Sequence, residues 1–463
     1  MDGDMSHNGT EGAADGGRRP SRRWFLGAGA GLAAGSALTA AATQAGSAGA
    51  PPSGPAGAPP SGPAGAPSSG PAGGAPLSGN GRVSPASFRA AHQPGILTGP
   101  ALACLLAAFR CRDRDRAGLA RTLRAVSAEL DALMAGHAPA GATGPAPSGR
   151  AAPGATGGPV ADSALLLGQG RQPVVATLSV GASLFDARYG LAGRRPAELV
   201  PMTALANDRL DPARLHGDLL VLFQADHPDV CVHALRRLTA AAGGSLVPVW
   251  SQDGFARPDA LATRGATGNR NLLGFKDGTG NPDAADPALM DRVVWVGPGD
   301  GEPAWATGGT YVAVRLIRLF VERWDQVPEA AQERVMGRRK ASGAPLDGVR
   351  ETDAPRYAAD PAGARTPLDA HIRLANPRTA GPEKAMLRRG FNYARGLDAG
   401  GLLDQGLAFV GYQRRLANFL AAQERLKGEP MEAFTRPEGG GFYFALPGAP
   451  GPGDYLGRGL VET

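Results

Sequence analysis

The stretch DLLVLFQADHPDVCVHALRRLTAAAG, residues 218–243, combines a strand and a helix in direct succession. Asp218–Gln224 is a short apolar run of a length typical of strands. A helix is predicted over Pro228–Ala242, because proline occupies its first turn and Gly243 follows its end. This stretch therefore predicts a strand–helix unit.

The same unit returns near the end of the chain, where the strand Leu407–Tyr412 is closely analogous and precedes a predicted helix over Leu416–Leu426. Further predicted elements surround both copies. In the first half they are strands at 101–110 and 174–181 and a helix at 117–135; in the second half they are strands at 310–321 and 441–446 and a helix at 324–338. The pattern predicts the α+β class, with two ferredoxin-like domains built on antiparallel sheets.

A glycine-rich segment between the two halves, Asn271–Pro282, reads NLLGFKDGTGNP. It places one acidic side chain, Asp277, among glycines that can adopt positive φ. Such a loop lets the backbone approach a flat ligand closely and directs a single carboxylate at it. Asp-Gly is also a common turn sequence, so an Asx-type turn is the alternative for Asp277 taken alone.

Two later blocks add a histidine and an arginine. The first is Asp369–Arg378, which contains His371, and the second is Met386–Gly390, which contains Arg388 and Arg389. One carboxylate, one histidine and one arginine are the side chains that a haem peroxidase needs.

The blocks, in this order, resemble the dye-decolourising peroxidases. The likeness covers nearly all of the chain from Phe88 onward and is greatest to the exported branch that includes the deferrochelatase/peroxidases of bacterial ferrous-iron uptake systems. Its remaining blocks are His92–Ile96, Gly181–Asp186, His216–Leu220, Gly411–Arg415 and Gly439–Gly448. The resemblance implies two ferredoxin-like domains arranged as in dimeric α+β barrels, with haem b held mainly by the second.

The resemblance also implies roles for individual residues. His371 is expected to ligate the haem iron, since a neutral imidazole suits iron and leaves the sixth position for peroxide. Asp277 is expected to be the distal acid/base, and Arg388 the distal cation, with Arg389 as the competing choice. Further expected haem contacts are Gly278, Thr279 and Gly280 on one side and Asn376, Pro377 and Arg378 on the other, where Arg378 could pair with a propionate.

These roles predict some properties of the reaction. A free aspartate carboxyl has a pKa of about 3.9, against about 6.5 for histidine, so we expect turnover to peak at acidic pH. The hydrogen-bond acceptor for the second nitrogen of His371 is not identified, because the family often has an acidic residue near position 415 and this chain has Arg415. Bulky donors that cannot reach a buried haem edge could be oxidised through surface Trp or Tyr radicals. The candidates, most of which we expect to be core or half-buried aromatics, are Trp250, Trp295, Trp305, Trp324, Tyr357 and Tyr393.

The residues described so far are compatible with three functions. The main hypothesis is a peroxidase that reduces hydrogen peroxide while oxidising an organic donor. The first alternative is a deferrochelatase that releases iron from haem and leaves the porphyrin intact, together with an iron-uptake permease. The second is a haem carrier without enzymatic activity. Homo-oligomerisation is left open.

The N-terminal region predicts export. Paired arginines, Arg22 and Arg23, precede a mild apolar run at 27–42, which is typical of a twin-arginine signal over residues 1–45. The run is too short and glycine-rich for a stable membrane span, which needs ~20 strongly apolar residues. We therefore expect a periplasmic, cell-envelope or extracellular protein.

The other boundaries follow from composition. Three repeats of eight Gly, Ala, Pro and Ser residues predict a tether over 46–81. The N-terminal domain is predicted over 82–285, with a disordered insert at 136–160, and the C-terminal domain over 286–463.

Charge and cysteines exclude other classes. The formal net charge is +6, but no Lys/Arg cluster interleaves with aromatics as a nucleic-acid surface requires. Cys104, Cys111 and Cys231 form no metal-binding pattern. Buried free thiols are the favoured interpretation, and a disulfide between Cys104 and Cys111 is the alternative.

Overall fold

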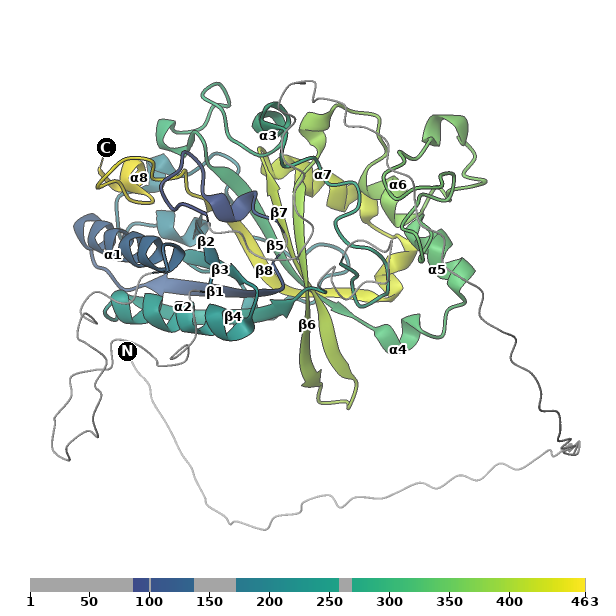
Figure 1. Ribbon diagram of the computed structural model, residues 1–463, viewed down its shortest axis with the longest axis horizontal. Helices are drawn as coiled ribbons and strands as arrows, with labels where there is room; N and C mark the ends of the chain where they lie inside the picture. The colour runs from purple at the N-terminus through teal and green to yellow at the C-terminus, as the bar shows by residue number, and fades with distance from the viewer. Residues whose placement is uncertain (1–85, 100, 137–171, 258–268, 463) are drawn as a thin grey trace, which may run out of the picture. The chain divides into compact units, whose positions relative to one another are not determined.

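The computed structural model describes residues 86–99, 101–136, 172–257 and 269–462 (Figure 1). The predicted signal and nearly all of the predicted insert, together with the tether, lie outside these ranges. Within them, no helix combines the length and the apolar character that crossing a bilayer requires.

The N-terminal half follows the predicted order. Its elements are β1 (Ala103–Cys111), α1 (Arg116–Met134), β2 (Val174–Gly181), β3 (Leu219–Ala225), α2 (Pro228–Ala241) and β4 (Leu246–Phe255). Helix α1 begins where the Asp115 side chain accepts a hydrogen bond from the Gly118 amide, and α2 begins at Pro228, as expected from its fixed φ.

The C-terminal half repeats the arrangement with longer connections. Its strands and closing helix are β5 (Thr310–Leu319), β6 (Leu387–Leu397), β7 (Leu403–Gln413), α7 (Leu416–Leu426) and β8 (Thr435–Ala445). Short helices lie between β5 and β6: α4 (Val321–Trp324), α5 (Glu329–Met336) and α6 (His371–Ala375). Helix α3 (Pro287–Val293) precedes β5, and α8 (Arg458–Glu462) follows β8.

The eight strands close into one antiparallel barrel in the order β1-β3-β2-β8-β5-β7-β6-β4. Each half contributes four neighbouring strands in the order fourth, first, third, second, which is the ferredoxin-like arrangement. The halves join where β2 pairs with β8 and where β4 meets β6 at Phe255 and Asn392. The predicted α+β class with two ferredoxin-like, antiparallel units is confirmed.

Three predictions of local structure were incomplete or wrong. The helix expected over 324–338 is two helices, because Pro328 has no amide hydrogen to donate and forces the chain out of helical geometry before α5. Strands β4 and β6 were not predicted. Their sequences, LVPVWSQDGF and LRRGFNYARGL, contain proline, glycine and charged residues and therefore lack a clear apolar run.

The core supports the site in two places. A large cluster of buried apolar side chains fills the barrel and its junction with the helices. A smaller cluster contains Leu273, Phe275 and Trp324 and packs directly under the segment that carries Asp277. All three cysteines are buried and free, so the disulfide between Cys104 and Cys111 is wrong, and burial raises the pKa of each thiol.

Strands β6 and β7 form a hairpin that extends past the other strands of the barrel (Figure 1). At the end of the hairpin that belongs to the barrel, Arg388 of β6 pairs with Gly411 of β7. The far end of the hairpin carries Leu397 and Leu403, which are exposed. The hairpin thus places one arginine at the base of the barrel and leaves its tip in solvent.

Candidate functional site

Asp277 lies in a tight turn that leaves half of its carboxylate without a partner. Its amide donates to the Asn269 carbonyl, and its Oδ1 accepts from the Gly278 amide at 2.8 Å. Gly278 and Gly280 have φ of +85° and +74°, which disfavour any side chain. Oδ2 is buried and has no hydrogen-bond partner among the described residues. A buried, unpaired carboxylate oxygen is costly and therefore indicates a site for a ligand or substrate atom.

Arg388 is fastened to the same turn from strand β6. The Asn281 side chain bonds both its amide and its carbonyl, at 3.1 and 2.9 Å, and Arg388 Nη2 donates to the Thr279 carbonyl at 2.7 Å. Burial lowers the pKa of Arg388, and the attraction of the Asp277 carboxylate opposes that shift. The structure thus brings the predicted acid/base and the predicted cation together.

Arg389 takes no part in this pairing. Successive side chains of a strand point to opposite faces, and Arg389 Nη2 donates to the Ile96 carbonyl at 3.3 Å. The choice of Arg388 over Arg389 therefore has a geometric basis.

Gly390, two residues beyond Arg388, faces Asp277 as well. A Cβ built at Gly390 would lie 2.2 Å from Asp277 Oδ2. Any other residue at position 390 would displace the carboxylate. Sequence reasoning did not single out Gly390, since only the fold shows what it faces.

The side chain of Glu351 bridges two residues of the turn that carries Asp277. Glu351 accepts from Lys276 Nζ at 2.5 Å through one oxygen and from Thr279 Oγ1 at 2.9 Å through the other. Arg338 is buried, donates to the Gly343 and Glu351 carbonyls, and lies beside Gly280. Burial lowers the pKa of Arg338, and the nearby positive charges of Arg378 and Arg388 lower it further.

His371 is the first residue of α6, and its ring is held by an acidic residue. Its Nδ1 lies 2.8 Å from Glu429 Oε2, and the Glu429 side chain is 8% exposed. The ring itself is 32% exposed, and no described residue bonds its Nε2. Glu429 is the acceptor that the sequence did not identify; Arg415, where an acidic residue was sought, pairs with Glu198 instead.

Residues at and just after the end of α5 contact both helix α6 and the turn that carries Asp277. A Cβ at Gly337 would lie 2.6 Å from Ile372 Cγ1, so α6 packs directly on this point. Arg338 follows and faces Gly280 and Arg388. The histidine helix and the carboxylate turn are therefore fixed to one short segment.

The three residues predicted on the histidine side lie at and just after the end of α6. Asn376 Oδ1 accepts from the Arg378 amide at 3.1 Å and so stabilises the positive φ of Arg378, 59°. Asn376 and Arg378 are exposed, and Pro377 is half-buried. Arg378 and Arg338 form a positive pair that sequence reasoning recognised only in part.

These residues fit a haem. His371 offers one free nitrogen with its other nitrogen on a carboxylate, the usual arrangement of a histidine that ligates a metal. Asp277 Oδ2 and Arg388 supply an acceptor and a cation, while Gly278 and Gly280 permit close approach of a flat ring.

The aromatic residues considered as relays are mostly core residues. Trp250, Trp295 and Trp324 are 6%, 5% and 0% exposed, and Tyr393 is 1% exposed. Trp295 stacks on His92 with ring centroids 3.9 Å apart. Trp324 touches both Phe275 and Phe434, which gives it the most direct connection to the Asp277 segment.

Comparisons with known proteins point to a single family. The family model described as Dyp-type peroxidase, N-terminal matches residues 93–256, and that described as Dyp-type peroxidase, C-terminal matches residues 268–450. A protein of Escherichia coli strain K12 named deferrochelatase is 44% identical over 392 residues, covering 84% of this chain and 90% of that protein.

Comparison with solved structures points to the same family. Ferric DtpA from Streptomyces lividans has a TM-score of 0.72 and 35% identity, covering 84% of this chain and all of that one. The DyP-type peroxidase from Cellulomonas bogoriensis has a TM-score of 0.71 and 33% identity, covering 83% and 99%.

Proposed function

Because this chain belongs to the Dyp-type peroxidase family of haem-dependent enzymes, we propose that it binds one haem b through His371 and reduces hydrogen peroxide at Asp277 and Arg388. The observation that carries this proposal is the buried, unpartnered Oδ2 of Asp277 next to Arg388. An acceptor held beside a cation suits peroxide, which has a proton to give and a negative charge to develop as its O–O bond breaks.

Each side chain has a defined task in this mechanism. Haem, when bound, supplies the iron that exchanges electrons with peroxide and donor. Asp277 Oδ2 takes the proton from the inner peroxide oxygen and returns it to the outer one, so that water leaves. Arg388 orients the peroxide and stabilises the developing oxyanion. Over the cycle, peroxide gains two electrons and two protons to give two waters, and the organic donor loses the two electrons.

On the other side, Glu429 accepts the proton of His371 Nδ1 in a hydrogen bond, which would leave Nε2 free to hold the iron of a bound haem. Gly278, Thr279 and Gly280 would pack on the haem, and Asn376 and Pro377 would line it on the histidine side. Arg378 and Arg338 suit the propionates, since both are cationic and lie near each other.

A peroxide-dependent dye assay tests this function. Haem-loaded protein should oxidise an aromatic dye only when peroxide is present, with a maximum at acidic pH. Asp277→Asn should reduce the rate by about 10²–10⁴-fold. The matched control is Asp283→Asn, which removes an exposed carboxylate six residues away. A rate equal in Asp277→Asn and wild type, or a pH maximum above neutrality, would count against the proposal.

Deferrochelatase activity is the second candidate, because relatives with 44% identity carry that name. In that case, incubation with haem should release iron and leave free protoporphyrin, seen by its fluorescence. A haem carrier would bind haem yet show neither reaction, and its binding would survive the double substitution Asp277→Ala and Arg388→Ala.

Export through the twin-arginine pathway belongs to the same proposal. A cofactor bound in the cytoplasm must leave with a folded protein, and Arg22 and Arg23 precede an apolar run that suits this route. Replacing both arginines by lysine should retain the protein inside the cell. An iron permease partner would be supported by co-purification from membranes.

A further inference from the structure

Three arginines surround one phenylalanine ring on the surface near α4. The guanidinium carbons of Arg323, Arg436 and Arg318 lie 4.8, 5.0 and 5.3 Å from the centroid of the Phe320 ring. The three come from α4, β8 and β5, respectively. Arg323 and Arg318 flank Phe320 in the chain, and the fold brings Arg436 to the same ring. Arginines stacked on a ring keep their N–H edges available for an anion.

These residues line a groove, called here the arginine groove. The residues of the groove that matter for its chemistry are Arg209, Arg318, Phe320, Arg323, Asp398 and Arg436. Among its lining residues, the four arginines face two carboxylates, those of Asp398 and Glu432. The groove therefore has an excess of positive charge.

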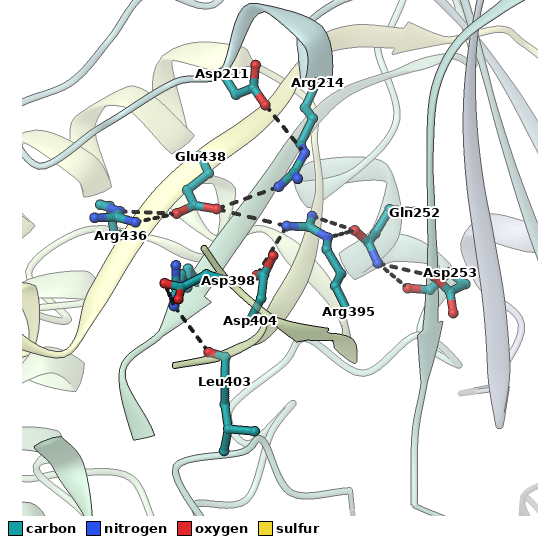
Figure 2. Close-up of polar contacts among 11 residues, drawn as sticks. Asp211, Arg214, Gln252, Asp253, Arg395, Asp398, Leu403, Asp404, Arg436 and Glu438 are labelled. Carbon is teal, nitrogen blue, oxygen red and sulfur yellow. Dashed lines mark hydrogen bonds and ion pairs between the residues drawn. The ribbon is translucent and has the colours of Figure 1, made fainter. Parts of the chain in front are cut away.

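The nearby carboxylates do not offset this charge fully. Arg318 pairs with Asp398 at 2.7 Å, yet its buried Nε has no hydrogen-bond partner among the described residues. Arg436 pairs with Glu438 at 2.7 Å, but Figure 2 shows that Glu438 also faces Arg214 and Arg395, at 3.7 and 3.9 Å. One carboxylate is thus shared by three arginines.

Arg323 has the least compensation. Its side chain is exposed, and no carboxylate of the described ranges lies within ion-pair distance of it. Its guanidinium lies over the face of the Phe320 ring. An exposed guanidinium held in place by a ring is ready to bind an oxyanion in a two-point contact.

The groove lies on the outer side of the aromatic residues that support the Asp277 segment. Phe434, between the groove residues Ala433 and Thr435, has its ring centroid 4.9 Å from that of Trp324. Trp324 follows Arg323, and its ring centroid lies 6.0 Å from that of Phe275, two residues before Asp277. The groove and the candidate site are therefore separated by a short layer of packed aromatic rings.

We infer that the arginine groove binds an aromatic anion, a sulfonate or carboxylate carried on a planar ring, which is the class of organic donor that this enzyme oxidises. The inference rests on the proposed peroxidase function for the fate of the ligand, but not for its binding. The arginine edges contact the oxyanion, and the guanidinium faces and Phe320 stack against the ring. A donor held there is adjacent to Trp324 without having to enter the haem site.

Equilibrium binding without peroxide tests the groove alone. The probe is naphthalene-2-sulfonate, titrated calorimetrically into the haem-loaded protein at low salt. Arg323→Gln should weaken binding about three- to tenfold, because it removes an exposed groove arginine that pairs with no carboxylate of the described ranges. Arg292→Gln on α3 makes the same charge change outside the groove and should leave the affinity at the wild-type value. Neutral 2-naphthol should bind more weakly than the sulfonate.

Several results would overturn the inference. They are no binding of the sulfonate, equal affinity in Arg323→Gln and wild type, or complete competition by an equal concentration of inorganic sulfate, which would indicate a site for simple anions only. Reaction of the wild-type protein with peroxide is measured separately. Its absence would remove the proposed function while leaving the binding result intact, so the two failures are distinguishable.

Discussion

His371 Nδ1 and Glu429 Oε2 lie 2.8 Å apart, although 58 residues separate them in the chain. The carboxylate is almost buried, and it fixes which ring nitrogen carries the proton. A histidine held in this way gives more electron density to a bound metal than one that donates to water. With His371 as the proposed iron ligand, this pair would connect α6 to the redox potential of the haem.

Replacing Glu429 by glutamine should raise the reduction potential of the haem-loaded protein. The neutral amide stabilises ferric iron less, and we expect a change on the order of 60 mV, equivalent to tenfold in a one-electron equilibrium. Spectroelectrochemical titration measures it. Glu424→Gln on α7 removes an exposed carboxylate and serves as the control. Equal potentials in Glu429→Gln and wild type would refute the role of this pair.

Gly390→Ala should impair the reaction with peroxide while keeping both Asp277 and Arg388. The new Cβ would meet Asp277 Oδ2 at 2.2 Å, so the carboxylate must move. We expect a loss of about 10-fold to 100-fold in the rate, since a misplacement near 1 Å has effects of this size. Gly299→Ala is the matched control, because its Cβ would meet nothing within 4 Å. Similar rates in both variants would show that Gly390 does not position the acid.

The two neighbouring arginines should behave differently when each is changed to glutamine. Arg388→Gln should lower the rate of the peroxide reaction by about 10²-fold or more, because it removes the cation beside Asp277. Arg389→Gln should act mainly on stability, since Arg389 is half-buried on the other face and donates to the Ile96 carbonyl. Rapid-mixing kinetics and thermal unfolding of both variants separate these effects. A larger kinetic loss in Arg389→Gln would reverse the assignment.

Asp300 should contribute stability that is lost in acid. Arg414 donates two hydrogen bonds to its carboxylate, at 2.7 and 2.6 Å, and these lower the pKa of Asp300 below the ordinary 3.8. Because the folded-state pKa is the lower one, the contribution is fully present above about pH 3.8 and disappears as the pH falls through the folded-state value.

Asp300→Asn should therefore reduce the free energy of unfolding near pH 6 by about 1 kcal/mol and make little difference once the pH lies below the folded-state pKa of Asp300. Urea unfolding across this pH range measures the change. Asp283→Asn, which removes a carboxylate without an arginine partner, should show no comparable pH dependence. A constant difference between Asp300→Asn and wild type at all pH values would contradict the prediction.

The sequence predicted those parts of the fold that carry a clear local signal. Strand β2 and helix α7 have the predicted bounds, since each is a continuous apolar or amphipathic run with turn residues at its ends. Strand β6 was missed because its pairing with β7, not its composition, makes it a strand. Pro328, where the helix expected over 324–338 splits, is visible in the sequence, but the prediction did not take it into account.

The sequence likewise identified some residues of the candidate site and missed others. Asp277, His371 and Arg388 were recognised because each lies in a distinctive block. Glu429 and Gly390 were not, since their roles depend on contacts between distant segments that no spacing reveals. The cluster of arginines around Phe320 was missed for this reason as well.

If Asp277 moves the peroxide proton at a haem ligated by His371, replacing it must slow the reaction with peroxide. This is tested most directly by stopped-flow absorbance of the haem-loaded protein mixed with one equivalent of hydrogen peroxide near pH 5. We expect a rapid, transient change of the haem spectrum in the wild type. In Asp277→Asn the change should be at least about 10²-fold slower, with equal haem content. A wild-type spectrum that peroxide leaves unchanged, or an equally fast change in Asp277→Asn, would contradict it.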